Sequence, residues 1–305
     1  MTTQSTPMAP ASCALCPRLC RADRAAGATG ICGADDTLRV ARAALHMWEE
    51  PPISGEAGSG TIFFSGCSLK CVFCQNHEIS TGNFGLKIEP ERLVQIMLEL
   101  QDQGALNINL VTATHYAHLL PWAIGRAREE GLSIPIVYNT SGYELERAVR
   151  DLGDLVDVWL TDYKYASPDL AAKLSNVRDY PDVARRGLAQ MCCEIRRRGG
   201  VEYDDHGTML QGMIVRHLVL PGHRKESIVL LHQLAELLPA DAFLLSLMGQ
   251  YTPPEQHLED PFLNRRIATF EYEYVRKCAV QLGLNGYGQD RSSATASYTP
   301  DFWTE

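Results

Sequence analysis

Residues 134–161, IPIVYNTSGYELERAVRDLGDLVDVWLT, place a segment of helical character between two apolar runs, and this unit decides the fold. The runs at 134–139 and 155–161 are nearly continuous in apolar residues, which is typical of parallel strands covered on both faces. The segment at 143–151 between them is expected to be a helix. A strand, a helix and a second strand in this order predict a parallel sheet.

The same alternation extends in both directions along the chain. In PERLVQIMLELQDQG (90–104), apolar residues recur with the i, i+3, i+4, i+7 spacing of a helix. Other helices are expected near 117–130, 181–198, 224–237 and 261–282, and other strands at 61–65, 106–112, 212–220 and 242–248. About six such repeats predict an α/β fold, either an open doubly wound sheet or a curved, barrel-like one. In both, the chemistry is expected at the carboxyl ends of the strands.

The composition bounds the function. The 305 residues are 45% hydrophobic and 21% charged, which is normal for a globular chain with a sizeable core. A net charge of −9 argues against broad nucleic-acid binding. No apolar run reaches roughly 18 residues, so no membrane span is expected.

The cysteines point to metal chemistry. The first residues, MTTQSTPMAPAS, lack the basic start and apolar core of a signal peptide. Seven of the ten cysteines fall between residues 13 and 74. Such clustering in a chain without a leader favours metal binding over disulfides and predicts a reducing, cytoplasmic location.

Three cysteines follow the strand expected at 61–65, in SGCSLKCVFCQNHE (65–78). Cys67, Cys71 and Cys74, called here the three-cysteine loop, have the spacing Cys-x3-Cys-x2-Cys. Three thiolates can hold three irons of a [4Fe–4S] cluster and leave one iron open, as a catalytic metal requires. A zinc site completed by His77, or three unrelated buried thiols, are the alternatives.

Four further cysteines precede this loop. Cys13, Cys16, Cys20 and Cys32, called here the N-terminal quartet, have the spacing Cys-x2-Cys-x3-Cys-x11-Cys. The pattern suits a closed four-ligand site that holds structural zinc or a second [4Fe–4S] cluster. Free thiols or disulfides are the alternative.

The motif Cys67-x3-Cys71-x-Phe73-Cys74 resembles the signature of radical S-adenosylmethionine (SAM) enzymes. The resemblance implies a [4Fe–4S] cluster whose unique iron chelates SAM. Reductive cleavage of SAM then gives a 5′-deoxyadenosyl radical, which abstracts hydrogen from a substrate, and the cofactor carries the difficult step. Phe73 is implied to lie near the adenine.

Residues 60–250 are similar in layout to the activating enzymes of pyruvate formate-lyase. LTDYKY (160–165) stands where those enzymes carry Asp-x-Lys, and MIVRHLVLPGH (213–223) where they carry an arginine-containing fifth strand. The resemblance implies that Asp162 approaches the SAM ribose, Lys164 its carboxylate, and Arg216 the active site. From the residues alone, a surface ion-pair set is the alternative.

Two strand ends differ from the family pattern. NINLVTATHY (107–116) replaces the usual Gly-Gly-Glu that binds the SAM amino group, so Thr112, Thr114 and His115 occupy that region. Threonine hydroxyls can accept a hydrogen bond from an ammonium group. Asn139 begins an Asn-Thr-Ser-Gly sequence where activases carry Asp-Thr-Asn-Gly. Thr112, Thr114 and Asn139 are therefore expected to contact the cofactor, and no catalytic side chain is predicted.

Four segments together resemble the PflX-type branch of activase-like radical SAM proteins: CALCPRLC, EEPPISGEAGSGTIFFSGCSLKCVFCQN, NLVTATHY and LMGQYTPP. The resemblance implies a partial (β/α)6 TIM-like barrel over residues 56–284. Residues 13–55 are poor in periodicity and rich in Cys, Gly, Ala and Arg, which suits a small cysteine-rich metal module. Residues 1–12 are expected to be a flexible tail, and 285–305 a C-terminal tail.

The expected function is that of a radical SAM oxidoreductase. Its target is either a glycine of a partner enzyme, as in glycyl-radical activation, or a peptide or small metabolite. A flavodoxin-like or ferredoxin-like electron donor is implied, and no nucleic-acid or membrane partner is expected. A non-catalytic iron–sulfur sensing or binding protein is the alternative, favoured by the missing Gly-Gly-Glu and opposed by Asp162 and Lys164.

Two further expectations concern single segments. Cys192, Cys193 and Cys278 lie in helical patterns and are expected to be buried small apolar residues. Residues 250–254, QYTPP, follow the sixth strand and are expected to line a substrate pocket or to form a rigid loop.

Overall fold

The computed structural model describes residues 5–81 and 84–288 of the chain. Its strands are β1 (Leu38–His46), β2 (Ser59–Phe64), β3 (Leu86–Ile88), β4 (Ile108–Val111), β5 (Ile136–Thr140), β6 (Val158–Asp162), β7 (Glu202–Tyr203), β8 (Met209–Leu218), β9 (Leu244–Met248) and β10 (Gly286–Gly288). Its α-helices are α1 (Pro51–Ser54), α2 (His77–Ser80), α3 (Pro90–Asp102), α4 (Leu120–Glu129), α5 (Glu146–Leu152), α6 (Pro168–Ser175), α7 (Tyr180–Arg197), α8 (Arg224–Leu237) and α9 (Thr269–Gln281). Two 3₁₀ turns are η1 (Thr114–Tyr116) and η2 (Pro261–Asn264).

The sheet is a partial barrel. The six expected strands are β2, β4, β5, β6, β8 and β9, and they pair in parallel in their order along the chain. A doubly wound sheet would reverse its strand order partway across. Within the described residues the sheet ends at β3 on one side and β10 on the other, so it does not close. The partial-barrel prediction is confirmed.

The outer helices are held by apolar stripes. Helix α3 begins at Pro90, which suits a first helical turn, and it buries Leu93 and Met97 completely. Each such side chain contributes about 1.5–3 kcal/mol to folding. The expected helix at 261–282 is interrupted, because the chain forms η2 and then α9. Helix α6 was not expected, although the Ser167 hydroxyl caps it by accepting from the Leu170 amide.

Strand β1 was also not expected, and it extends the sheet beyond the six parallel strands. It pairs antiparallel with β2 on one side and β3 on the other. The predicted domain boundary at residue 55 therefore falls between two paired strands, and that division stays a prediction. The expected tails, residues 1–12 and 285–305, lie partly outside the described residues. The described part of the C-terminal tail contains β10.

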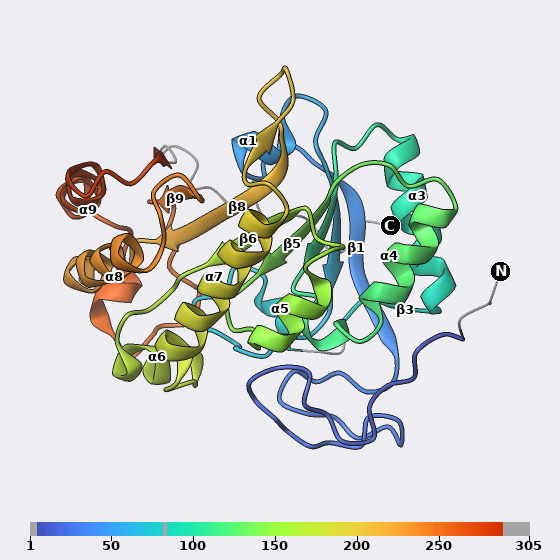
Figure 1. Cartoon of the computed structure of the whole chain (residues 1–305). Helices are drawn as coiled ribbons and strands as arrows, with labels where there is room; N and C mark the ends of the chain where they lie inside the picture. The colour runs from blue at the N-terminus through green and yellow to red at the C-terminus, as the bar shows by residue number, and fades with distance from the viewer. Residues whose placement is uncertain (1–4, 82–83, 289–305) are drawn as a thin grey trace.

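Different segments lie at the two ends of the barrel. Helices lie along the outside of the sheet, and α1 lies at the end where β2 begins (Figure 1). The N-terminal loop, drawn in blue, lies at the opposite end. That end carries the carboxyl ends of the parallel strands, where ligands bind in such folds. None of the helices in the described part of the chain is both long and apolar enough to cross a membrane.

Candidate functional site

A cavity of about 290 Å³ lies at the carboxyl ends of the parallel strands. Its lining contains the whole three-cysteine loop. It also contains all but one of the other side chains that the sequence predicted for SAM: Phe73, Thr112, Asn139, Asp162, Lys164 and Arg216. The exception is Thr114, which lies outside the lining residues.

The three-cysteine loop has a backbone that few residues tolerate. Gly66 has φ +95° just before Cys67, and Lys70 has φ +57° just before Cys71. The Ser175 hydroxyl donates a hydrogen bond of 2.8 Å to the Cys71 sulfur. His77, the alternative fourth ligand, is exposed and is not among the residues that line the cavity.

Burial sets the acidity of these thiols. Burial, followed by the neighbouring Cys71 and Cys67, raises the pKa of Cys74 to about 12. Burial also raises the pKa of Cys71, against the opposing charge of Lys164. A metal must displace these protons to bind. Three thiols on one short loop, facing a cavity that also presents a buried cation, fit a three-ligand iron–sulfur cluster.

Asp162 is the centre of an ion-pair network beneath the loop. Its carboxylate lies 2.5 Å from Lys164 Nζ and 2.8 Å from Arg216 Nε. Asp162 and Arg216 stand opposite each other on the neighbouring parallel strands β6 and β8. Burial opposes the charge on Asp162, but Arg216 and Lys164 outweigh it and hold its pKa below the ordinary value. The three side chains are largely buried and face the cavity, so they are not a surface ion-pair set.

Glu49 completes this network and was missed by the sequence reasoning. It precedes the barrel strands, yet its carboxylate lies 3.2 Å from Arg216 Nη1. It also accepts hydrogen bonds from the amides of Asn109 (2.9 Å) and Asn139 (3.2 Å). Burial raises its pKa, and Arg216 opposes that rise. Glu49 begins the segment EEPPISGEAG, which contributes to the resemblance to the PflX-type branch but was not predicted to take part in the site.

The end of β4 is strained. Thr112 has φ +60°, a left-handed conformation that is a genuine outlier for a β-branched residue. Its amide donates to the Asn139 carbonyl at 2.9 Å, which ties the ends of β4 and β5 together. Such strain persists only where the surrounding structure enforces it, and it concentrates at functional sites.

Thr114 does not line the cavity but makes a hydrogen bond to a buried carboxylate. Its hydroxyl and that of Thr140 both donate to Glu144 Oε1 at 2.5 Å. Glu144 is buried, and burial raises its pKa to about 7 against these two hydrogen bonds.

The lining of the cavity also includes aromatic side chains. The rings of Phe73 and Tyr251 lie with their centroids 6.0 Å apart. Gln250, Tyr251 and Thr252 all line the cavity, as the pocket interpretation of QYTPP expected. Trp48 is 64% exposed and also contributes to the lining.

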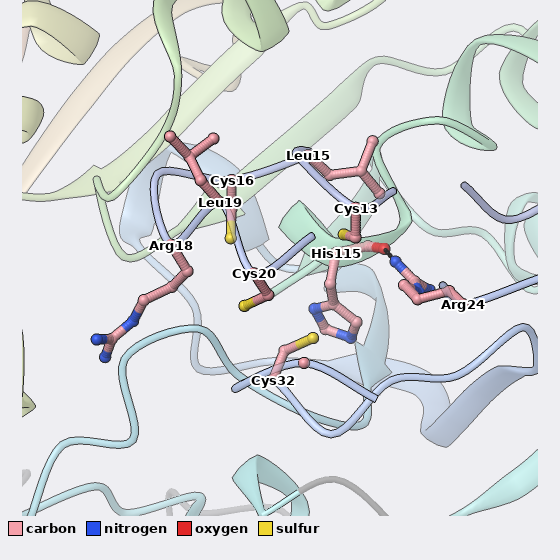
Figure 2. Close-up of a pocket in the computed structure, with 10 residues that line it drawn as sticks. Cys13, Leu15, Cys16, Arg18, Leu19, Cys20, Arg24, Cys32 and His115 are labelled. Atoms are coloured by element: carbon pink, nitrogen blue, oxygen red, sulfur yellow. Dashed lines mark hydrogen bonds between the residues drawn. The ribbon is translucent and has the colours of Figure 1, made fainter. Parts of the chain in front are cut away.

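The N-terminal quartet surrounds a second, smaller space of about 10 Å³ (Figure 2). Cys13, Cys16 and Cys32 are buried, and Cys20 is partly exposed. Burial raises the pKa of Cys16 to about 12. In the part of the chain that the structure describes, no group of three or more His, Cys, Asp or Glu side chains is already arranged to hold a metal ion. The four thiols nevertheless line one common space.

A buried cation borders the quartet. Arg24 is 1% exposed and lines the same small space. Its Nε donates to the Asp35 carbonyl (2.9 Å) and its Nη1 to the His115 carbonyl (2.5 Å). None of the ion pairs found among the described residues involves Arg24. Its charge lowers the pKa of Cys32, although burial is the larger effect and raises it.

The remaining cysteines agree only in part with the expectation of burial. Cys192 in α7 is buried, as expected. Cys193 is exposed, so that prediction is wrong: the apolar stripe of α7 includes one member of the pair and excludes the next. Cys278 in α9 is partly exposed.

Residues 61–192 match the family model of the radical SAM superfamily. The matched residues contain the three-cysteine loop, Asp162 and Lys164. Members of that superfamily use a [4Fe–4S] cluster and SAM and are generally enzymes.

Individual proteins that resemble this chain are between 11% and 29% identical to it. The uncharacterized protein MJ0674 of Methanocaldococcus jannaschii is 29% identical over 250 residues, which cover 79% of this chain and 67% of that protein. The crystal structure of Streptococcus suis SuiB is similar in fold, with a TM-score of 0.50 and 15% identity over 76% of this chain. The chain spans about half the length of SuiB (48%). A domain of a pyruvate-formate lyase-activating enzyme from Bacteroides vulgatus matches 57% of this chain and 92% of its own, at 11% identity and a TM-score of 0.41.

Proposed function

We propose that this protein is a radical SAM enzyme that cleaves SAM reductively and abstracts hydrogen from a bound substrate. The observation that carries the proposal is the shared cavity. The three-cysteine loop and the buried Asp162–Lys164–Arg216 network face the same 290 Å³ space. Lys164 and the strained Thr112 line this space together with the three thiols, and strain of this kind concentrates at functional sites.

Each group in the cavity suits one part of SAM. Lys164 offers ammonium donors to a carboxylate, and Asp162 can accept from ribose hydroxyls. Phe73 and Tyr251 form an aromatic wall against which an adenine can stack. Thr112 and Asn139 also line the cavity, and they are proposed to accept hydrogen bonds from the SAM amino group in place of Gly-Gly-Glu. When bound, the cluster and SAM supply the electron transfer and the radical chemistry.

The N-terminal quartet is proposed to hold a second metal centre. Four thiols line one space, and Arg24 borders it without an ion-pair partner among the described residues. A buried charge that lacks a counter-charge costs several kcal/mol. Thiolates around a metal supply that negative charge, whereas protonated thiols do not. Zinc and a [4Fe–4S] cluster both suit these ligands.

The proposed target is a glycine of a partner enzyme, and the proposed reductant is a small flavodoxin-like or ferredoxin-like protein. The support is the similarity to activating enzymes at LTDYKY and MIVRHLVLPGH. A peptide or small metabolite is the second candidate, since Glu49 and Arg216 line the cavity and offer polar contacts to either.

Electron paramagnetic resonance tests the target. The reconstituted, reduced protein is incubated with SAM and candidate glycyl-radical proteins, and the same samples are assayed for 5′-deoxyadenosine. A stable protein radical that forms only with SAM supports a glycine of a partner enzyme as the target. Formation of deoxyadenosine without a radical in any candidate protein contradicts a glycine target and favours a peptide or small metabolite as the substrate.

A further inference from the structure

His115 lies between the two cysteine clusters. It belongs to η1, the turn that follows β4, and its side chain is 2% exposed. Its Nε2 lies 2.7 Å from the carbonyl oxygen of Ser65, two residues before Cys67. Because a carbonyl oxygen can only accept, Nε2 carries the hydrogen. In the neutral ring Nδ1 then keeps a free lone pair.

That second nitrogen has no hydrogen-bond partner among the described residues. His115 lines the quartet space, and Figure 2 shows its imidazole pointing into the space that the four thiols surround. The carbonyl of the same residue is held by Arg24. Backbone and ring are therefore both fixed, and the unpartnered nitrogen is aimed at the quartet.

A buried nitrogen without a partner costs about 1–3 kcal/mol. The neighbouring groups offer little compensation, because thiols are weak donors and no nitrogen of Arg24 makes a hydrogen bond to Nδ1. A water molecule there would itself need two to four polar partners. A metal ligand, in contrast, shows this same pattern: one ring nitrogen binds the metal and the other donates to a backbone carbonyl.

We propose that His115 coordinates, through Nδ1, the metal centre of the N-terminal quartet, in place of one of its four thiolates. The inference rests on the second centre proposed above. It gives that centre a mixed sulfur and nitrogen ligand set, which both zinc and iron–sulfur sites use.

The same residue joins the second centre to the first. Its Nε2–H bond holds the backbone that leads into the three-cysteine loop. A Cβ on Gly66 would meet the Cys32 carbonyl oxygen at 2.5 Å and His115 Nε2 at 3.3 Å. The backbone at the start of the three-cysteine loop therefore packs directly against Cys32 of the N-terminal quartet and against His115.

The test isolates the second centre in the full-length chain. Cys67, Cys71 and Cys74 are all replaced by alanine, so that bound metal reports on the quartet. Iron, sulfide and zinc are counted in protein labelled with ¹⁵N-histidine. A bound iron–sulfur cluster is reduced and examined for nitrogen hyperfine coupling. Bound zinc is examined by X-ray absorption for a nitrogen at about 2.0–2.1 Å beside sulfur at about 2.3 Å.

Two histidine variants complete the design. His115→Gln keeps an N–H donor for Ser65 but supplies no imidazole. His118→Ala is the matched control, because His118 Nδ1 also lacks a partner among the described residues but His118 is not in the quartet lining. Both substitutions are also made in a chain that keeps Cys67, Cys71 and Cys74. If the triple alanine variant does not fold, the metal content of these two proteins reports the loss of metal from the quartet.

The proposal expects a nitrogen at the metal that is lost in His115→Gln and kept in His118→Ala, with metal affinity at least about tenfold lower in the former. Metal bound by sulfur alone, or nitrogen coupling that survives His115→Gln, overturns the role of His115 and leaves the second centre standing. If the quartet binds neither iron nor zinc while the parent protein cleaves SAM, the second centre and this inference both fail, and the SAM reaction stands.

Discussion

The hydroxyl of Ser175 lies 2.8 Å from the sulfur of Cys71 and donates a hydrogen bond to it. Ser175 ends α6, and its oxygen also lies 2.7 Å from the hydroxyl of Tyr165. The end of α6 is thus tied to the loop that would carry the cluster. Hydrogen bonds to the ligand sulfurs are one of the factors that set iron–sulfur reduction potentials.

Replacement of Ser175 by alanine is expected to make the reduction potential of the first cluster more negative. The lost hydrogen bond stabilises extra electron density on the thiolate, so reduction becomes harder without it. Redox titration followed by electron paramagnetic resonance measures the shift at equal iron content. Ser175→Thr keeps the hydroxyl and is the control. An unchanged potential in the alanine variant would contradict the role of this bond.

Replacement of Arg216 by alanine is expected to destabilise the protein by about 3–5 kcal/mol, because Glu49 and Asp162 lose a buried counter-charge. Chemical denaturation measures the loss. The added substitution Glu49→Gln is expected to recover part of it, since one of the two uncompensated carboxylates is removed. Strict additivity of the two changes would show that these side chains are not coupled.

Thr112→Gly is expected to have a free energy of unfolding about 1 kcal/mol higher than Thr112→Ala. Both variants remove the hydroxyl, but only glycine adopts φ +60° without strain. Thermal or chemical denaturation of the pair provides the comparison. Equal stabilities would mean that the left-handed conformation at the end of β4 carries no cost.

Glu144 is expected to make stability fall as pH rises. Burial holds its pKa at about 7 in the folded protein, above the ordinary value of 4.5. Between these values the folded chain binds more protons than the unfolded chain, so stability is fully present below about pH 4.5 and is lost up to about pH 7. The effect is on the order of 3 kcal/mol.

Glu144→Gln provides the control for this pH dependence. Its amide oxygen can still accept from Thr114 and Thr140, and it does not titrate. The variant is expected to be more stable than the parent at pH 8 and to lose the decline between pH 4.5 and 7. A decline of the same size in both proteins would assign it to other groups.

The six parallel strands were predictable because each is covered on both faces and reads as an apolar run. Strand β1, LRVARAALH, was not, because it is partly exposed and carries two arginines within the strand. Helix α6 was missed although Ser167-Pro168 is a capping signal, since the segment is only eight residues long.

The candidate site shows the same division. Cys67, Cys71 and Cys74 share one loop, so their spacing alone predicts their meeting. Glu49 meets Arg216 across a separation of 167 residues, which only the sheet topology brings about. His115 sits at a predicted strand end, but which cluster its ring faces depends on how the N-terminal loop folds back over the barrel.

The measurement that tests the central claim most directly is formation of 5′-deoxyadenosine. The protein is reconstituted with iron and sulfide without oxygen, reduced with dithionite and given SAM. The parent is compared with Cys71→Ala and with Cys193→Ala, which removes an exposed thiol of α7 instead. The account predicts deoxyadenosine from the parent and Cys193→Ala and none from Cys71→Ala. Equal formation by Cys71→Ala, or none by a cluster-loaded parent, would contradict it.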